Sequence, residues 1–256
     1  MSSEAHSLHE VPNFITLIHS AFGKNWFVDL LVSCEDLIFA LLVSITISVI
    51  FTLGTRNALL IPKRFQNFLE SIAEGLRTVV FSIIGPHGEP YIPFIGTIFI
   101  YTLTMNLFGL VPLLKAPSSS LNITIAQSIC VFILVQYLNI KNFGITGFMY
   151  HLAGSPKDLV GWLIAPLLFP IELLTQISRP LTLALRLFGN MFGEHVLVGY
   201  FAFIGAGILP WIGLPFQTPL LFWGLLTSLM QAMVFALLTT VYIMLSLPHD
   251  NEEALV

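Results

Sequence analysis

Charged side chains are scarce in this sequence. Aspartate, glutamate, lysine and arginine make up 9% of the 256 residues, whereas hydrophobic residues make up 56%. An average soluble domain is about 25% charged, so this composition excludes an ordinary soluble protein. The mean hydropathy of +0.88 indicates an integral membrane protein. The net charge of −4 is small and lies mostly near the two ends, which argues against nucleic acid as a partner.

The sequence also lacks the usual signatures of a cofactor, metal or nucleotide site. Its two cysteines, Cys34 and Cys130, lie in or beside apolar runs, as packed thiols do. A phosphate-binding G-x-x-x-x-G-K-[ST], a dinucleotide-binding G-x-G-x-x-G and a zinc-binding H-E-x-x-H are all absent. We expect no cofactor, no metal ion and no catalytic residue, so that any chemistry comes from ionisable groups at membrane depth. Residues 1–22 lack the basic start and apolar core of a signal peptide, and we expect no cleavage there.

Long uncharged runs fill most of the remaining sequence. About 20 helical residues cross a hydrocarbon core of about 30 Å. We expect single transmembrane helices at 37–55, 92–114 and 122–140. Prolines are dense in the last part, where we expect two long, tilted helices at 163–208 and 213–247 that form a hairpin. The sequence therefore predicts an all-α integral membrane protein with about five transmembrane helices.

The segment at 62–84 has a different pattern, with apolar residues at helical spacing and charged residues between them. The apolar positions are Phe65, Phe68, Leu69, Ile72, Leu76, Val79, Val80 and Ile83. This pattern predicts an amphipathic helix that lies at the membrane interface. An ordinary helix docked on its own protein is the alternative that the pattern leaves open.

The placement of lysine and arginine predicts how this single membrane domain, 1–256, is oriented. Basic residues cluster after the first expected span, at Arg56, Lys63, Arg64 and Arg77. Residues 1–36 hold one basic residue, Lys24, and several acidic ones. By the positive-inside rule, the segment at 1–36 is extracytoplasmic, and five crossings place the acidic tail at 248–256 in the cytoplasm.

An arginine lies in the middle of the apolar run expected at 163–208. A mid-membrane arginine costs about 2.5–3.5 kcal/mol on insertion scales and cannot lose its proton, so Arg186 needs a partner or water. At about 100° per residue, several polar or small residues fall on the same face of the helix. They are Glu172, Thr175, Arg179, Thr182, Asn190 and Gly193. Glu194 and His195 point elsewhere, which gives the helix two separate polar environments.

The sequence leaves two sources open for the partner of Arg186. One is an acid on the same helix, Glu172 or Glu194, and the other is a group outside the chain. The expected helix at 213–247 offers a facing polar surface, where the carbonyl of Gln231 could accept a hydrogen bond from Arg186. Periodicity equally allows Gln231 to be satisfied by a neighbouring backbone group. That surface consists of Gly224, Thr227, Ser228, Gln231 and Thr239.

Five stretches of the sequence occur in the order found in one protein family. The longest are RPLTLALRLFGNMFGEHV, which begins at Arg179, and LMQAMVFALLTTVYI, which begins at Leu229. The others, upstream, are PKRFQNFLE, TMNLFGLVP and APSSSLNITIA. From about Ile61 to Leu247, the sequence closely resembles subunit a of the F-type ATP synthases in its bacterial form.

The resemblance implies a stator subunit of the F0 sector that lies beside a rotating ring of c subunits and forms two half-channels with it. It implies proton transport coupled to ATP synthesis, or pumping in reverse, in a bacterial plasma (inner) membrane. The implied partners are the c-ring with its mid-membrane carboxylates, the b subunit of the peripheral stalk, the rest of the F0F1 complex and membrane lipid. The nucleotide sites then lie in other subunits, and the transported ion is H⁺, with Na⁺ also open.

The resemblance also assigns roles to individual residues. Arg186 matches the essential arginine that faces the ring carboxylate, and Asn190 and Gln231 match polar residues near it. Glu172 matches an acid of the cytoplasmic half-channel. On the same side, the basic or polar positions are Arg179 and Thr182. Positions near the outer half-channel are matched by Asn106, Ser118, Ser120 and Asn122.

Three positions depart from the family pattern. Some members pair an acid on the arginine helix with a histidine on the last helix, where this sequence has His195 and Gly224. Some also carry an acid where Gly109 stands. We expect His195 and the adjacent Glu194 to serve the outer half-channel instead, since an unperturbed histidine titrates near neutral pH. A structural histidine bonded to a backbone carbonyl is the alternative.

Two other classes of protein compete with this interpretation. A secondary transporter binds its substrate between broken helices and usually shows internal repeats, and none is apparent in this sequence. A purely structural scaffold has no reason to keep buried ionisable residues, which are costly in a membrane. The sequence therefore favours an ion-translocating stator subunit over both.

Overall fold

The described part of the chain is helical throughout. A computed structural model describes residues 26–56, 64–111, 113–152, 159–208 and 213–247. Within these ranges the elements are α2 (Trp26–Ser33), α3 (Glu35–Thr55), α4 (Arg64–Ile84), η1 (Pro86–Tyr91), α5 (Ile92–Phe108), η2 (Pro117–Ser119), α6 (Leu121–Leu152), α7 (Leu159–Ile208) and α8 (Gly213–Leu245). The expectations for most of the N-terminal segment and for the tail at 248–256 lie outside the described residues.

Four helices in the described ranges are long and apolar enough to cross a membrane. They are Glu35–Thr55, Pro86–Phe108, Leu121–Gly144 and Pro219–Leu245. This finding confirms the expected all-α integral membrane protein. Helix α7, which we expected to cross as well, is not among the four, so its crossing stays a prediction.

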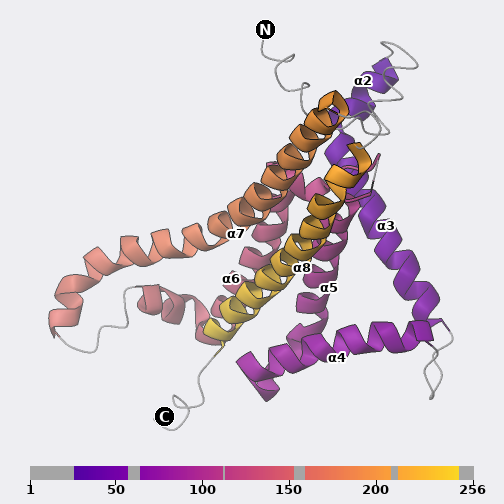
Figure 1. Cartoon of the computed structure of the whole chain (residues 1–256). Coiled ribbons are helices and arrows are strands. Elements are labelled where there is room, and N and C mark those ends of the chain that lie inside the picture. The colour runs from indigo at the N-terminus through magenta and orange to yellow at the C-terminus, as the bar shows by residue number, and fades with distance from the viewer. Residues whose placement is uncertain (1–25, 57–63, 112, 153–158, 209–212, 248–256) are drawn as a thin grey trace.

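Helices α5, α6, α7 and α8 form the centre of the molecule (Figure 1). Helix α7 packs along both α6 and α8, and α8 also packs along α5. One cluster of buried apolar side chains joins these helices, and Leu187 on α7 and Phe235 on α8 are fully buried within it. Helix α3 leans away from the others towards one end of the bundle, where α4 runs across (Figure 1). The bundle therefore fixes which face of α7 is covered and which is left open.

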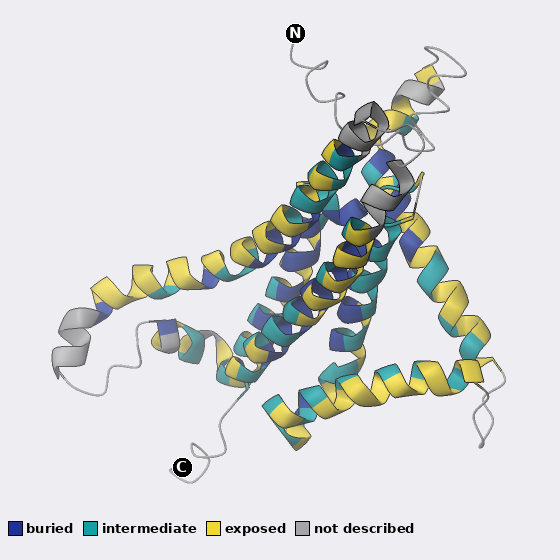
Figure 2. Cartoon of the chain, in the orientation of Figure 1, coloured by how far each residue is buried: buried dark blue, intermediate teal, exposed yellow. Residues whose placement is uncertain are grey.

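Helix α4 is attached to the bundle mainly through its second half. Val80 is its buried residue, and Leu76 and Ile84 pack against the core cluster. In the first half, Phe65 and Phe68 are 51% and 61% exposed. Much of α4 is coloured as exposed in Figure 2. Docking on its own protein thus covers only part of the apolar face. The exposed phenylalanines fit the interfacial position that the pattern predicts.

Two of the expected helix ends are wrong. Helix α5 ends at Phe108 rather than at 114, because turns follow and Leu113 adopts a left-handed backbone with φ 72°. Helix α6 continues to Leu152 rather than ending at 140, with a break at Gly144, where φ is 68°. Glycine adopts this conformation without a steric penalty, so the chain bends there and resumes as a helix.

The other bounds differ from expectation by a few residues. Helix α3 begins at Glu35 rather than 37, α4 at Arg64 rather than 62 and α7 at Leu159 rather than 163. Helix α8 ends at Leu245 rather than 247. The short helix α2, within the N-terminal segment, was not expected, because its eight residues are too few to stand out as a periodic pattern.

Candidate functional site

Arg186 lies on the outward side of α7. Its side chain is exposed, whereas Leu183, Ala184 and Leu187 are buried against the bundle. Within the described ranges, Arg186 makes no ion pair and no hydrogen bond through its side chain. The helix therefore presents a permanent cation to whatever lies beside it in the membrane.

The polar stripe predicted around Arg186 is also turned outward. Thr182 and Asn190 are exposed, and Glu172 and Arg179 are half-buried. Much of the described surface of α7 is exposed apolar side chain (Figure 2). The buried face of α7 is on the opposite side, so the described residues cover the stripe only in part.

The acid at one end of the stripe is paired with a different arginine. Arg179 Nη2 lies 3.9 Å from Glu172 Oε1, and the Arg179 guanidinium lies 5.6 Å from the ring centroid of Tyr242 on α8. Thr182 Oγ1 donates to the backbone carbonyl of Arg179 at 3.0 Å. The alternative in which Glu172 neutralises Arg186 is therefore not what the structure contains.

Asn190 and Gln231 join α7 to α8 one turn beyond Arg186. Asn190 Nδ2 donates to Gln231 Oε1 at 2.7 Å, and Gln231 is buried. The Gln231 carbonyl, which could have accepted from Arg186, accepts from Asn190 instead. The two amides lock the helices together and leave the guanidinium of Arg186 out of the contact.

Glu194 faces α8 and not Arg186. Thr227 Oγ1 donates to Glu194 Oε2 at 2.8 Å. The carboxylate lies against Gly224, where an added Cβ would overlap Glu194 Oε1. Because Gly224 has no side chain, the carboxylate of Glu194 fits against α8 at this position.

His195 faces the end of α5 in the same region. A Cβ added at Gly109 would lie 2.7 Å from both Cε1 and Nε2 of His195, and 2.7 Å from Cβ of Ala116. The imidazole thus fills the space beside Gly109.

Several buried polar groups lie between α5, α6 and α8. Asn106 Nδ2 donates to the carbonyl of Ser228 at 3.4 Å, and Gln127 Nε2 donates to Thr102 Oγ1 at 2.5 Å. In the described part of the chain, four side-chain oxygens here are buried without a hydrogen-bond partner. They are Asn106 Oδ1, Ser118 Oγ, Gln127 Oε1 and Ser228 Oγ. An unsatisfied buried polar group costs about 1–3 kcal/mol, so this region favours water molecules that complete the bonding.

Of the four residues expected near the outer half-channel, the structure buries only two fully. Asn106 and Ser118 are buried, Ser120 is half-buried and Asn122 is exposed at the start of α6. Sequence reasoning missed Gln127. A signal was available, because three polar residues of α6 recur at helical spacing and all are buried. They are Thr124, Gln127 and Ser128.

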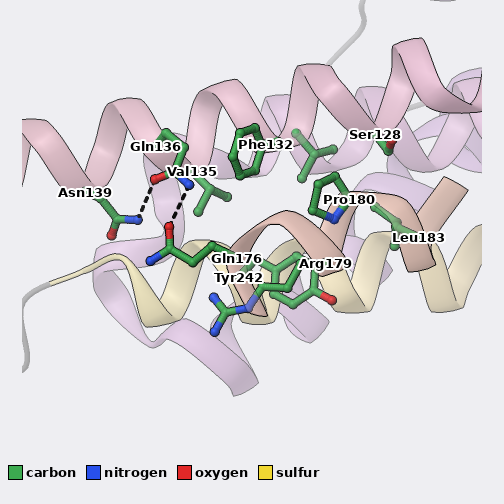
Figure 3. Close-up of a pocket in the computed structure, with 11 residues that line it drawn as sticks. Ser128, Phe132, Val135, Gln136, Asn139, Gln176, Arg179, Pro180, Leu183 and Tyr242 are labelled. Carbon is green, nitrogen blue, oxygen red and sulfur yellow. Dashed lines mark hydrogen bonds between the residues drawn. The ribbon is translucent and has the colours of Figure 1, made fainter. Parts of the chain in front are cut away.

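A pocket lies between α6, α7 and α8 on the side of Arg179 (Figure 3). Gln136 Nε2 donates to Gln176 Oε1 at 2.8 Å, and Asn139 Nδ2 donates to Gln136 Oε1 at 3.4 Å. Pro180 lacks the N–H that would bond the carbonyl of Gln176, so the pocket is also where the helix ladder is interrupted. These three amides were not among the residues expected from the sequence. No group of metal-ligating side chains occurs among residues that the structure describes.

These features define a helical membrane protein that carries ionisable side chains on an exposed helix face and in a buried polar region. The family model described as ATP synthase A chain matches residues 37–244, and the chain belongs to this family. ATP synthase subunit a of Protochlamydia amoebophila is 53% identical over 248 residues, which cover 95% of this chain and 92% of that protein.

More distant relatives have the same description. ATP synthase subunit a 1 of Pelobacter propionicus is 40% identical over 200 residues, covering 78% of this chain and 81% of the relative. ATP synthase subunit a of Citrifermentans bemidjiense is 34% identical over 243 residues, covering 92% of this chain and all of the relative. The resemblance seen in the sequence motifs is thus confirmed over most of the chain.

Proposed function

We propose that this chain is the stator subunit of an F0 sector and moves protons across the membrane together with a ring of c subunits. The observation that carries the proposal is Arg186, an exposed cation on α7 with no ion pair among the described residues. A cation in that position needs an anion from outside the chain. A ring that brings one carboxylate after another past α7 supplies it.

The chemistry of arginine suits this role. Its guanidinium stays protonated, so Arg186 attracts each ring carboxylate once the carboxylate has lost its proton. The same charge blocks direct passage of a proton past it, and protons must then travel with the ring. A membrane potential of 100 mV supplies about 2.3 kcal/mol per charge to bias the rotation.

Two polar regions on either side of Arg186 support two half-channels. Glu194 lies about 12 Å from Arg186 along the helix axis, and Glu172 lies about 21 Å away in the other direction, at 1.5 Å per residue. The outer route is assigned to Glu194 and His195, together with Asn106 and Ser118. The inner route is assigned to the Glu172 end, with Arg179 and Thr182.

The setting of the protein is part of the proposal. The partners are the c-ring, the b subunit of the peripheral stalk and the rest of the F0F1 complex, in a bacterial plasma (inner) membrane. Helix α7 is taken as a fifth crossing, and α7 and α8 as a tilted hairpin against the ring. The N-terminus is then extracytoplasmic and the C-terminus cytoplasmic, and the nucleotide sites lie on other subunits.

ATP-driven proton pumping by the assembled complex in proteoliposomes tests the proposal. Arg186→Gln removes the charge and nearly preserves length, and we expect pumping to be abolished while the complex still assembles. Arg77→Gln is the matched control, because Arg77 is an exposed arginine on α4 that pairs with Glu89. Normal pumping by the Arg186→Gln complex would refute the mechanism. Solute uptake by the isolated chain would support a secondary transporter instead.

A further inference from the structure

An ion cluster joins the first turn of α3 to the linker between α5 and η2. Lys115 Nζ lies 3.2 Å from Asp36 Oδ1 and 3.8 Å from Glu35 Oε1. The exposed fractions of the side chains are 10% for Glu35, 21% for Lys115 and 36% for Asp36. Partly buried pairs are screened by salt much less than surface pairs, so this contact depends less on ionic strength than an ordinary surface salt bridge.

The linker that carries Lys115 contains a backbone conformation that needs support. Leu113, two residues before Lys115, is left-handed with φ 72°, and its side chain is exposed. A non-glycine residue persists in this region only where its surroundings enforce it. The ion pairs of Lys115 and the fully buried Ala116 are the contacts that immediately follow.

The same linker forms one wall of the site that holds His195. Ala116 and His195 both approach Gly109, because a Cβ added at Gly109 would lie 2.7 Å from each. Ser118 follows in η2 with a fully buried hydroxyl that has no partner in the described structure. Helix α7 also packs against η2. A displacement of the linker would therefore move a wall of the His195 site directly.

We propose that Lys115 is a positioning residue for the outer polar site: its pairs with Glu35 and Asp36 hold the linker and η2 against α7. Ala116 then keeps its place beside Gly109 and His195, and Ser118 keeps its place in η2. The inference rests on the proposed function, in which that site is the outer half-channel. Lys115 touches no transported ion in this scheme and acts through the position of the linker.

The first test measures the initial rate of ATP-driven proton pumping by the assembled complex in proteoliposomes. We expect Lys115→Gln to lower the rate about fivefold, since small displacements of a polar route slow transfer along it. Lys115→Arg keeps the charge and restores most of the rate. Arg77→Gln breaks an ion pair of 3.1 Å whose side chains are 58% and 65% exposed, and it leaves the rate unchanged.

The second test reads the linker itself. Ser118→Cys is introduced into a chain in which Cys34 and Cys130 are replaced by serine, and its reaction with a water-soluble maleimide is timed. Addition of Lys115→Gln speeds labelling about tenfold if the tether controls local opening of the linker. Unchanged labelling overturns the proposal even if pumping falls, because Lys115 then does not act through the linker.

Failure of this inference is distinguishable from failure of the proposed function. Pumping by the Arg186→Gln complex overturns both. Loss of pumping in Arg186→Gln together with normal pumping in Lys115→Gln overturns only the positioning role. If Lys115→Gln does not assemble, the exchange of Lys115→Asp with Asp36→Lys replaces it: recovered assembly and pumping support the tether, and no recovery overturns it.

Discussion

Gly224→Ala tests the contact between Glu194 and α8. A Cβ at this position overlaps the Glu194 carboxylate and lies 2.7 Å from Cδ2 of Leu110 and 3.0 Å from Cδ of Glu194. The carboxylate must then move away from Thr227 Oγ1, which now donates to it at 2.8 Å. Overpacking of this kind costs about 1–3 kcal/mol, and part of the cost is recovered if Glu194 rotates towards water.

Two measurements on the purified complex follow this change. We expect the midpoint of thermal dissociation in detergent to fall, and the initial rate of proton pumping to fall with it, because Glu194 leaves the proposed outer route. Gly75→Ala on α4 is the control, since a Cβ there meets nothing within 4 Å. Alanine favours a helix over glycine by about 1 kcal/mol, so the control loses no stability.

A double variant isolates the contact between the two residues. Glu194→Ser removes the carboxylate atoms that a Cβ at Gly224 would overlap and leaves only the contact with the flexible end of Leu110, so Gly224→Ala should cost less in that background. Coupling between residues in contact is typically about 0.5–3 kcal/mol. If Gly224→Ala lowers thermal stability equally in both backgrounds, the Glu194 carboxylate does not lie against Gly224, and the proposed contact is refuted.

Two further predictions concern neighbouring contacts. Asn190→Ala removes the 2.7 Å donor to Gln231 and leaves a buried amide unsatisfied, which we expect to cost about 1–3 kcal/mol in the thermal stability of the complex; stability equal to the parent would contradict the contact. His195→Ala empties the space beside Gly109, and we expect slower proton flux between pH 6 and pH 8, measured by pumping in proteoliposomes, because a titratable group is lost. A flux that matches the parent throughout this range would return His195 to a purely structural role.

The predicted helices were right where one signal dominated and wrong where local geometry intervened. Uncharged length alone was enough to predict a helix close to Glu35–Thr55. The same signal extended α5 too far, since the residues after Phe108 remain apolar while Leu113 turns the backbone. The hydropathy of a segment depends on its composition alone. A turn inside an apolar run does not change it, so hydropathy could not locate the end of α5.

The expectations for the candidate site divide in the same way, into relations within one helix and contacts between helices. Helical phase predicted that Arg186 shares a face with Asn190 and that Glu194 points elsewhere, and these relations depend only on positions along one helix. Phase could not decide whether Gln231 would bond to Arg186 or to Asn190. That choice depends on the axial offset between α7 and α8, which packing sets.

By itself, the sequence determined that this is a helical membrane protein with a cation that cannot be neutralised by losing its proton. Its motifs also determined the family. Only the tertiary structure decided that Arg186 faces outward while Glu172 pairs with Arg179, and that Glu194 and His195 occupy the spaces beside two glycines. The physical reason is that composition and helical period describe a single segment. The space beside a glycine is formed by residues far apart in the sequence, which meet only after the helices pack.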